Sequence, residues 1–141
     1  MSPADAAAAD AGSDAPVPAT ETPFLDRLRR CIEQRQADGQ GLALLVVDCG
    51  VIGRIDALWG DQVGDAARAR IIASLRAEVL RPDDFIGELG RDDLACVLSL
   101  VDGPQLAQLA AEKLLRTMNA PLWLGEAEVY ASPSVGIAKF P

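Results

Sequence analysis

A short run of apolar residues, Leu42 to Val47, constrains the fold of this chain more than any other feature. The run is uninterrupted and ends at Asp48. Such a run is typical of a strand whose two faces are both covered, because side chains on each face avoid water. The sequence therefore predicts a sheet that contains this buried strand and has helices packed on it, an α/β arrangement.

Helical and extended patterns divide the rest of the chain. Periodic apolar residues and end signals predict helices over 22–38, 51–59 and 65–80 and from 104 onward. Extended runs predict further strands over 84–89, 94–100, 128–131 and 134–140. The expected order is α-β-α-α-β-β-α-β-β. The chain ends directly after the last strand, so we expect the helix that would cover this strand to lie beyond Pro141.

The first 22 residues differ in composition from the rest. They hold four acidic residues, no basic residue and few large apolar side chains. Such a segment cannot bury enough surface to offset the entropy lost on ordering. The basic start and apolar run of a secretory signal are also absent. We therefore expect a disordered acidic leader over 1–22 and a folded domain over 23–141.

Composition excludes several classes of function. The net charge is −8, which argues against binding to nucleic acid. The chain has no histidine, which excludes a Ser-His-Asp triad and histidine-ligated zinc. The three cysteines form no Cys-x-x-Cys pair and are expected to be buried free thiols in a reducing cytoplasm. No stretch approaches the roughly 20 apolar residues of a membrane span.

Two places carry carboxylates that could do chemistry. Asp48 follows a buried strand, where open α/β sheets bind ligands; alternatively it is a solvated turn residue or caps the next helix. Asp92 and Asp93 stand at the tip of the expected hairpin after Gly90. With a third carboxylate they could hold a divalent cation, or they form an ordinary polar turn.

Taken together, the spacing of these features resembles the GGDEF (diguanylate cyclase) family. That family reads D-x-D-x-F-K-x-x-N-D-x-x-G-H-x-x-G-D from its first strand. This chain fits the pattern without a gap, with matches at Asp48, Gly60, Gly64 and Asp65. The family signature G-G-D-E-F falls on residues 90–94, which read Gly-Arg-Asp-Asp-Leu.

Two further motifs extend the resemblance over residues 24–141. The family's R-x-x-D motif falls in register on Arg81 and Asp84, and its S-x-G-x-A strand resembles residues 134–138. The resemblance implies a nucleotide-cyclase-type sandwich, with a mixed, mostly antiparallel sheet and helices packed on it. It also implies a chain that lacks the family's C-terminal helix and strand, as in a piece of a longer GGDEF–EAL protein.

The resemblance also implies roles for individual residues. Members of the family join two GTP molecules into cyclic di-GMP between two facing domains, with bound magnesium. It implies Mg²⁺ ligands at Asp48, Asp92 and Asp93, and guanine recognition at Asp56 and Asp65. Arg81 and Asp84 would then form an allosteric site for cyclic di-GMP.

Several departures weaken the catalytic part of this pattern. Arg91 replaces the second signature glycine, and its guanidinium could pair with Asp92 and Asp93 or point to water. Asp93 is one methylene shorter than the family's glutamate, which should weaken a Mg²⁺ site. Gly53 stands at a lysine position, and Asp56 replaces an asparagine that can both donate and accept.

The resulting hypothesis is a non-catalytic regulatory domain in cyclic di-GMP signalling, with the three signature residues Arg91, Asp92 and Asp93 as remnants of a catalytic site. We expect it to act in the cytoplasm, as a homodimer or beside an EAL phosphodiesterase or sensory domain. Its ligand would be cyclic di-GMP or GTP. Two alternatives remain: a weakly active diguanylate cyclase, and a docking module that binds no nucleotide.

Overall fold

Four antiparallel strands form the central sheet of the structure, a computed structural model that describes residues 21–100 and 103–141. Strand β1 (Leu42–Asp48) lies in the middle and pairs with β3 (Asp93–Ser99) on one side and β6 (Ser134–Phe140) on the other. Strand β2 (Phe85–Glu88) pairs with the outer edge of β3. The buried strand expected from the sequence is therefore one of the two interior strands, and every pairing in this sheet is antiparallel.

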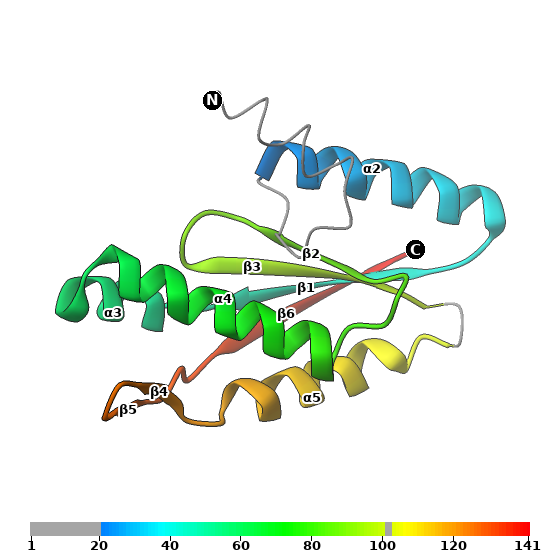
Figure 1. Cartoon of the computed structure of the whole chain (residues 1–141). Coiled ribbons are helices and arrows are strands. Elements are labelled where there is room, and N and C mark those ends of the chain that lie inside the picture. The colour runs from blue at the N-terminus through cyan, green and yellow to red at the C-terminus, as the bar shows by residue number, and fades with distance from the viewer. Residues whose placement is uncertain (1–20, 101–102) are drawn as a thin grey trace.

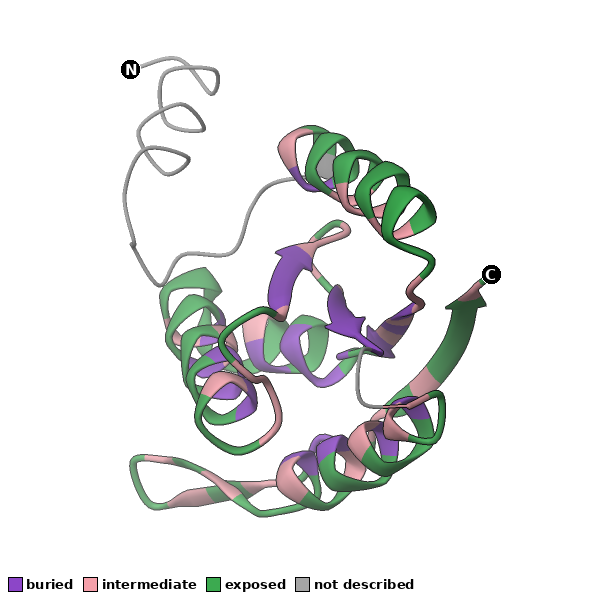
Figure 2. Cartoon of the chain, turned by 90° about the vertical axis from the view of Figure 1, so that its right-hand side faces the viewer, coloured by how far each residue is buried: buried purple, intermediate pink, exposed green. Residues whose placement is uncertain are grey.

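Helix α2 (Glu21–Asp38) covers one face of the sheet (Figures 1 and 2). Its anchor is Phe24, which is fully buried and packs edge-on against Phe85 of β2. Gly87 makes room for this ring, because an added Cβ would lie only 2.2 Å from Phe24 Cδ1. Burying one such side chain contributes about 1.5–3 kcal/mol, so Phe24 holds the helix on the sheet.

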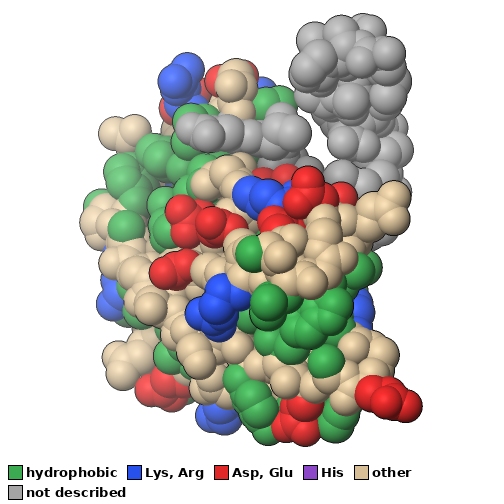
Figure 3. Space-filling view, turned by 90° about the vertical axis from the view of Figure 1, so that its left-hand side faces the viewer, with side chains coloured by type: hydrophobic (Ala, Val, Ile, Leu, Met, Phe, Trp, Pro, Cys, Tyr) green, Lys and Arg blue, Asp and Glu red, His purple; other side chains and the backbone are tan. Residues whose placement is uncertain are grey.

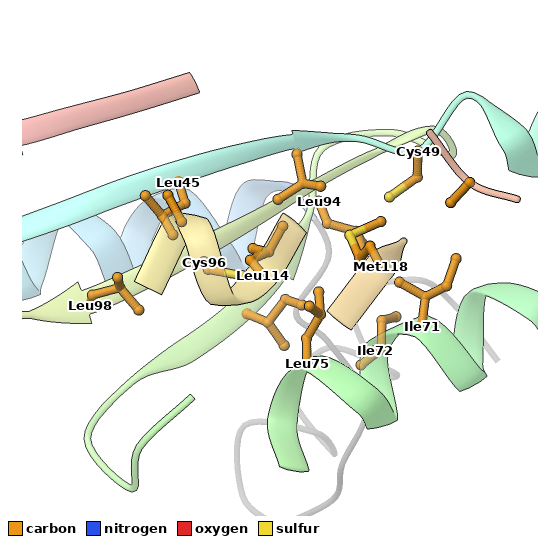
Figure 4. Packing of buried hydrophobic residues seen from close by; sticks show 14 of the residues in the cluster. Leu45, Cys49, Ile71, Ile72, Leu75, Leu94, Cys96, Leu98, Leu114 and Met118 are labelled. Carbon is orange, nitrogen blue, oxygen red and sulfur yellow. The ribbon is translucent and has the colours of Figure 1, made fainter. Parts of the chain in front are cut away.

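The opposite face carries helices α3 (Val51–Trp59), α4 (Asp61–Glu78) and α5 (Leu106–Met118) (Figure 1). Side chains of β1 alternate between the two faces, as the period of a strand requires. Ala43, Leu45 and Val47 enter the larger core beneath these three helices, whereas Leu42 and Leu44 contact the α2 side. Figure 4 shows the larger core, with Leu75 of α4 and Leu114 of α5 facing the strands.

A two-stranded ribbon, β4 (Leu122–Leu124) with β5 (Ala127–Val129), follows α5. It packs near α4, and the Arg70 guanidinium donates to the carbonyl of Trp123. Strand β6 then returns to the edge of the main sheet. Most of β6 is exposed, including Ile137 at 45%.

The element order matches the sequence prediction, with three differences. Helix α4 begins at Asp61 rather than Asp65, because Gly60 takes a positive φ of 93° and separates it at once from α3. Strand β4 was not predicted, since three residues are too few to show a period. The expected leader lies outside the described residues except for Glu21 and Thr22, which begin α2. Within the described part of the chain, no helix is long and apolar enough to cross a membrane.

Candidate functional site

The candidate site lies where β1 ends and the β2–β3 hairpin turns. The backbone N–H of Cys49, just after β1, donates to the carbonyl of Asp92 at 2.6 Å. This bond fixes the hairpin tip beside the start of α3. Gly90 has a positive φ of 91°, which lets the chain reverse there.

Arg91 leaves this hairpin tip and reaches the turn between α3 and α4. Its Nε and Nη2 donate to the two carboxylate oxygens of Asp56, at 2.5 and 2.8 Å. Its Nη1 donates to Asp65 Oδ1 at 2.8 Å, and Nη2 also donates to the carbonyl of Asp61 at 3.2 Å. One guanidinium thus joins two helices to the hairpin, with a bidentate pair at Asp56.

This arrangement corrects the expectations for Arg91. The sequence suggested that the guanidinium either pairs with Asp92 and Asp93 or points to water. Instead it pairs with Asp56 and Asp65, the two residues expected to recognise guanine. On the face that carries α3 and the hairpin tip, basic side chains lie among a group of acidic ones (Figure 3).

Gly64 of α4 makes this close approach possible. An added Cβ at Gly64 would lie 1.7 Å from Asp56 Oδ1 and 3.1 Å from Arg91 Nη2. Real Cβ atoms never tolerate the first distance, so any side chain here would displace the Asp56 carboxylate. The contact between Arg91 and Asp56 therefore requires a glycine at position 64.

The charges in this cluster reinforce one another. The hydrogen bonds from Arg91 hold the pKa of Asp56 below its usual range. In turn, the hydrogen bonds to Asp56 and then Asp65 raise the pKa of Arg91 above its usual range. The cluster stays partly open, because the side chains of Arg91, Asp56 and Asp65 are 36%, 15% and 57% exposed. The Arg91–Asp56 pair is therefore ionised, and the cluster is reachable from water.

The three carboxylates expected to bind magnesium lie near one another, around Cys49 at the end of β1. Asp48 Oδ1 accepts the N–H of Gly50 at 2.9 Å, as a turn residue does. Asp93 is the direct cross-strand neighbour of Asp48, and the Asp92 carboxylate lies beside Gly53 of α3. Among the described residues, no group of three acidic, histidine or cysteine side chains is arranged to hold a metal ion. Binding of Mg²⁺ at these carboxylates stays a prediction.

Cys49 lies next to these acids. Burial raises the pKa of its thiol to about 12, and the charges of Asp48, Asp93 and Asp92 add to the rise. The thiol is therefore protonated at neutral pH and is not a nucleophile. The sequence prediction of buried free thiols is confirmed for Cys49 and Cys96, while Cys31 is half-buried.

Arg81 and Asp84 are brought together at the end of the sheet away from the hairpin. Asp84 Oδ2 accepts the backbone N–H of Arg81 at 2.9 Å and its Nε at 3.3 Å. Asp84 Oδ1 accepts the N–H of Ser99 at 3.0 Å, and Arg81 Nη2 donates to the carbonyl of Ser99. The Asp84 side chain is only 1% exposed. This pair fastens the turn before β2 to the end of β3.

Comparison with known proteins decides the family. The model of the family described as "Diguanylate cyclase, GGDEF domain" matches residues 21–141. The chain belongs to the GGDEF family. Its fold is accordingly the cyclase sandwich expected from the sequence.

Individual relatives agree with this assignment. The GGDEF domain matches MucR of Pseudomonas aeruginosa, a bifunctional diguanylate cyclase and cyclic di-GMP phosphodiesterase, with 31% identity over 116 residues. The match covers 82% of this chain but 17% of MucR, so the chain spans a small part of this relative. The solved GGDEF domain of TpbB (YfiN) from P. aeruginosa superposes with a TM-score of 0.79 at 26% identity, over 90% of this chain and 79% of that one. The GGDEF domain of DgcB from Caulobacter crescentus, solved with cyclic di-GMP, shares the fold at a TM-score of 0.77 and 19% identity, over 92% and 77%.

Sequence reasoning missed three members of the GGDEF domain's arginine–acid clusters. The carbonyl of Asp61 and the cradle at Gly64 complete the Arg91 cluster, and the backbone of Ser99 completes the Arg81 cluster. Gly64 was recognised as a motif match, but nothing in the sequence linked it to Arg91. Backbone groups leave no signal in the sequence, because every residue carries them.

Proposed function

We propose that this chain is a non-catalytic regulatory domain in cyclic di-GMP signalling. The observation that carries the proposal is the pairing of Arg91 with Asp56 and Asp65. These are the carboxylates that the family resemblance places against guanine. A nucleotide that needs them must first displace three guanidinium hydrogen bonds from within the chain.

The chemistry of Asp56 adds to the obstacle. Guanine presents an acceptor, its carbonyl oxygen, beside N–H donors. An asparagine could donate to that oxygen, whereas the Asp56 carboxylate only accepts. Because Arg91 keeps Asp56 ionised, Asp56 would repel the guanine oxygen.

The part of the site that would face the phosphates also lacks a cation. Gly53 supplies no cation at the lysine position of the family, and the Asp92 carboxylate lies near it. Among the residues that the structure describes, no group of three acidic, histidine or cysteine side chains is arranged to hold a metal ion. Positioning and charge stabilisation are the main protein contributions to phosphoryl transfer, so these features together support a domain without turnover.

A relative with two activities supports a role beside another domain. MucR combines a cyclase with a phosphodiesterase in one protein. We propose that this chain likewise serves a neighbouring domain, such as an EAL phosphodiesterase, in a longer cytoplasmic protein. In a weakly active cyclase, Arg91 would have to move away from Asp56 and Asp65. Its side chain is 36% exposed, so the experiment below tests for this movement.

The test is product formation from GTP with Mg²⁺ or Mn²⁺, using this chain and any longer natural protein that contains it. We expect no cyclic di-GMP after long incubation. Arg91→Ala should bind GTP at least about tenfold more tightly than the wild type, because it removes the guanidinium that pairs with Asp56 and Asp65. Arg116→Ala, which removes an exposed charge on α5, is the matched control. Product from the wild type that is abolished by Asp92→Ala would establish the active-cyclase alternative instead.

Binding of cyclic di-GMP at Arg81 and Asp84 stays a prediction. Both Asp84 oxygens already accept N–H groups of the chain, so a ligand would have to contact Arg81 or displace the bond to Ser99. Titration calorimetry with cyclic di-GMP and with GTP tests it. Heat with cyclic di-GMP that is lost in Arg81→Ala but kept in Asp65→Ala supports the site. GTP binding that depends on Asp65, with no heat from cyclic di-GMP, points to a GTP-sensing domain.

A further inference from the structure

The cluster around Arg91 is a set of acceptors that converges on one planar cation. It consists of both oxygens of Asp56, Oδ1 of Asp65 and the carbonyl oxygen of Asp61. All four atoms accept hydrogen bonds from Arg91, and a second guanidinium, that of Arg68, lies 3.8 Å from Asp65 Oδ1 at the edge of the set. A guanidinium group has the opposite character, with five N–H donors in a fixed plane and no acceptor.

A second observation shows that the cradle is shaped to admit such a group. The guanidinium seated in it arrives from a different element, the β2–β3 hairpin, and uses all three of its nitrogens. Gly64 lines the cradle, where a Cβ would clash with Asp56 and crowd Arg91. The site is therefore defined by shape as well as by charge.

The same acceptor set is poorly matched to other ligands. A guanine edge would place its carbonyl oxygen against a carboxylate, and a primary ammonium cannot span the plane of a bidentate pair. A neutral ureido group has the right plane but carries an acceptor oxygen in place of one N–H arm.

We propose that Asp56, Asp65 and the carbonyl of Asp61 form a guanidinium-binding site, which Arg91 fills from within the chain and which accepts a guanidinium ligand when Arg91 leaves. The ligand class is a free guanidinium compound or an arginine side chain of another protein. Arg91 acts as a tethered competitor, whose attachment gives it a high effective concentration. The inference rests on the same contacts as the proposed function, but it concerns what binds rather than whether GTP reacts.

The experiment is an NMR titration of the 141-residue chain at constant ionic strength, following backbone amides over 60–65 and 90–92. The first probe is agmatine, which carries a guanidinium. Its controls are cadaverine, a diammonium of similar length and charge, and N-carbamoylputrescine, which keeps the ammonium of agmatine but has a neutral ureido group in place of the guanidinium. In Arg91→Ala we expect saturable agmatine shifts at least about tenfold tighter than those of either control. The wild type should bind agmatine at least about tenfold more weakly than Arg91→Ala, because the tethered arginine competes.

Two further measurements distinguish the sources of the ligand and show that a loss of binding is not caused by misfolding. Blocked peptides that contain arginine or citrulline show whether an arginine side chain enters as readily as agmatine. If only agmatine binds, the ligand is a free small molecule; if the arginine peptide binds as tightly, a protein partner fits. Arg91→Ala carrying Asp56→Asn should lose the agmatine preference while keeping a folded spectrum.

The outcomes are distinct from those of the proposed function. Equal shifts with agmatine, cadaverine and N-carbamoylputrescine in a folded Arg91→Ala protein would overturn the guanidinium site and indicate simple charge screening. Such a result would leave the absence of GTP turnover unaffected. Conversely, product from GTP in the wild type would overturn the proposed function without removing a measured preference for guanidinium.

Discussion

Two arginine–aspartate clusters of this domain use the same chemistry in opposite ways. Arg81 and Asp84 are three residues apart, and Asp84 is 1% exposed, with its oxygens held by backbone and side-chain N–H groups. Arg91 instead reaches across 35 positions to Asp56 and 26 to Asp65, and its side chain stays 36% exposed. The first cluster is part of the frame of the fold, whereas the second fills a site that water can reach.

The difference shows that a motif's residues do not fix its role. Arg81 and Asp84 match a ligand-binding motif, yet both carboxylate oxygens of Asp84 already accept hydrogen bonds within the protein. Arg91 breaks a motif, yet it is the residue that occupies the candidate site. Burial separates the two cases: a buried carboxylate must be satisfied within the fold, but an exposed pair exchanges partners with solvent at low cost.

The largest expected effect concerns the buried cluster. Asp84→Ala should lower the free energy of unfolding by about 3 kcal/mol, because the N–H groups of Arg81 and Ser99 lose their acceptor. Urea denaturation measures this. Asp83→Ala, at the exposed neighbouring position, should change it by less than about 0.5 kcal/mol. Equal effects of the two substitutions would show that the Asp84 cluster is not part of the frame.

Gly64→Ala should break the exposed cluster without a large loss of stability. The added methyl group displaces the Asp56 carboxylate, while the change to alanine within α4 favours the helix by about 1 kcal/mol. We expect loss of the bidentate pair, seen as a rise in the pKa of Asp56 by NMR. An unchanged Asp56 pKa would mean that the cradle does not depend on Gly64.

Arg91→Ala should alter the dependence of stability on pH. In the wild type, the hydrogen bonds from Arg91 lower the folded-state pKa of Asp56. A depressed pKa stabilises the fold above the unfolded value, near 3.9, and this contribution is lost as the pH falls through the folded value. The wild type should therefore exceed Arg91→Ala in stability at neutral pH, and the two should converge in acid. Thermal unfolding measures this, and a difference in melting temperature between the two proteins that stays constant from pH 2 to 7 would contradict it.

The smallest expected effect is that of salt. Raising ionic strength from about 0.1 to 1 M shortens the Debye length from about 10 to 3 Å and screens exposed pairs most. The stability difference between wild type and Arg91→Ala should shrink, while that between wild type and Asp84→Ala should persist. Urea midpoints at the two salt concentrations provide the comparison, and similar shrinkage of both differences would remove the distinction between the clusters.

Much of the fold could be predicted from the sequence, because its signals are local. The apolar run before Asp48 indicated an interior strand, and the stripe on α5 reaches the core at Leu114 and Met118. The three-residue strand β4 and the start of α4 at Asp61 escaped detection. The first is too short for a period, and the second depends on the backbone conformation of Gly60.

By itself, the sequence determined the family register, the free thiols and the set of acidic residues at the candidate site. It also determined that Arg91 replaces a glycine at the hairpin tip. Only the tertiary structure decided where the Arg91 guanidinium goes. That contact depends on the register of β2 with β3 and on the bond from Cys49 to Asp92, which bring the hairpin tip to the turn between α3 and α4. Contacts between distant segments follow from the packing of whole elements, and no local pattern of residues encodes them.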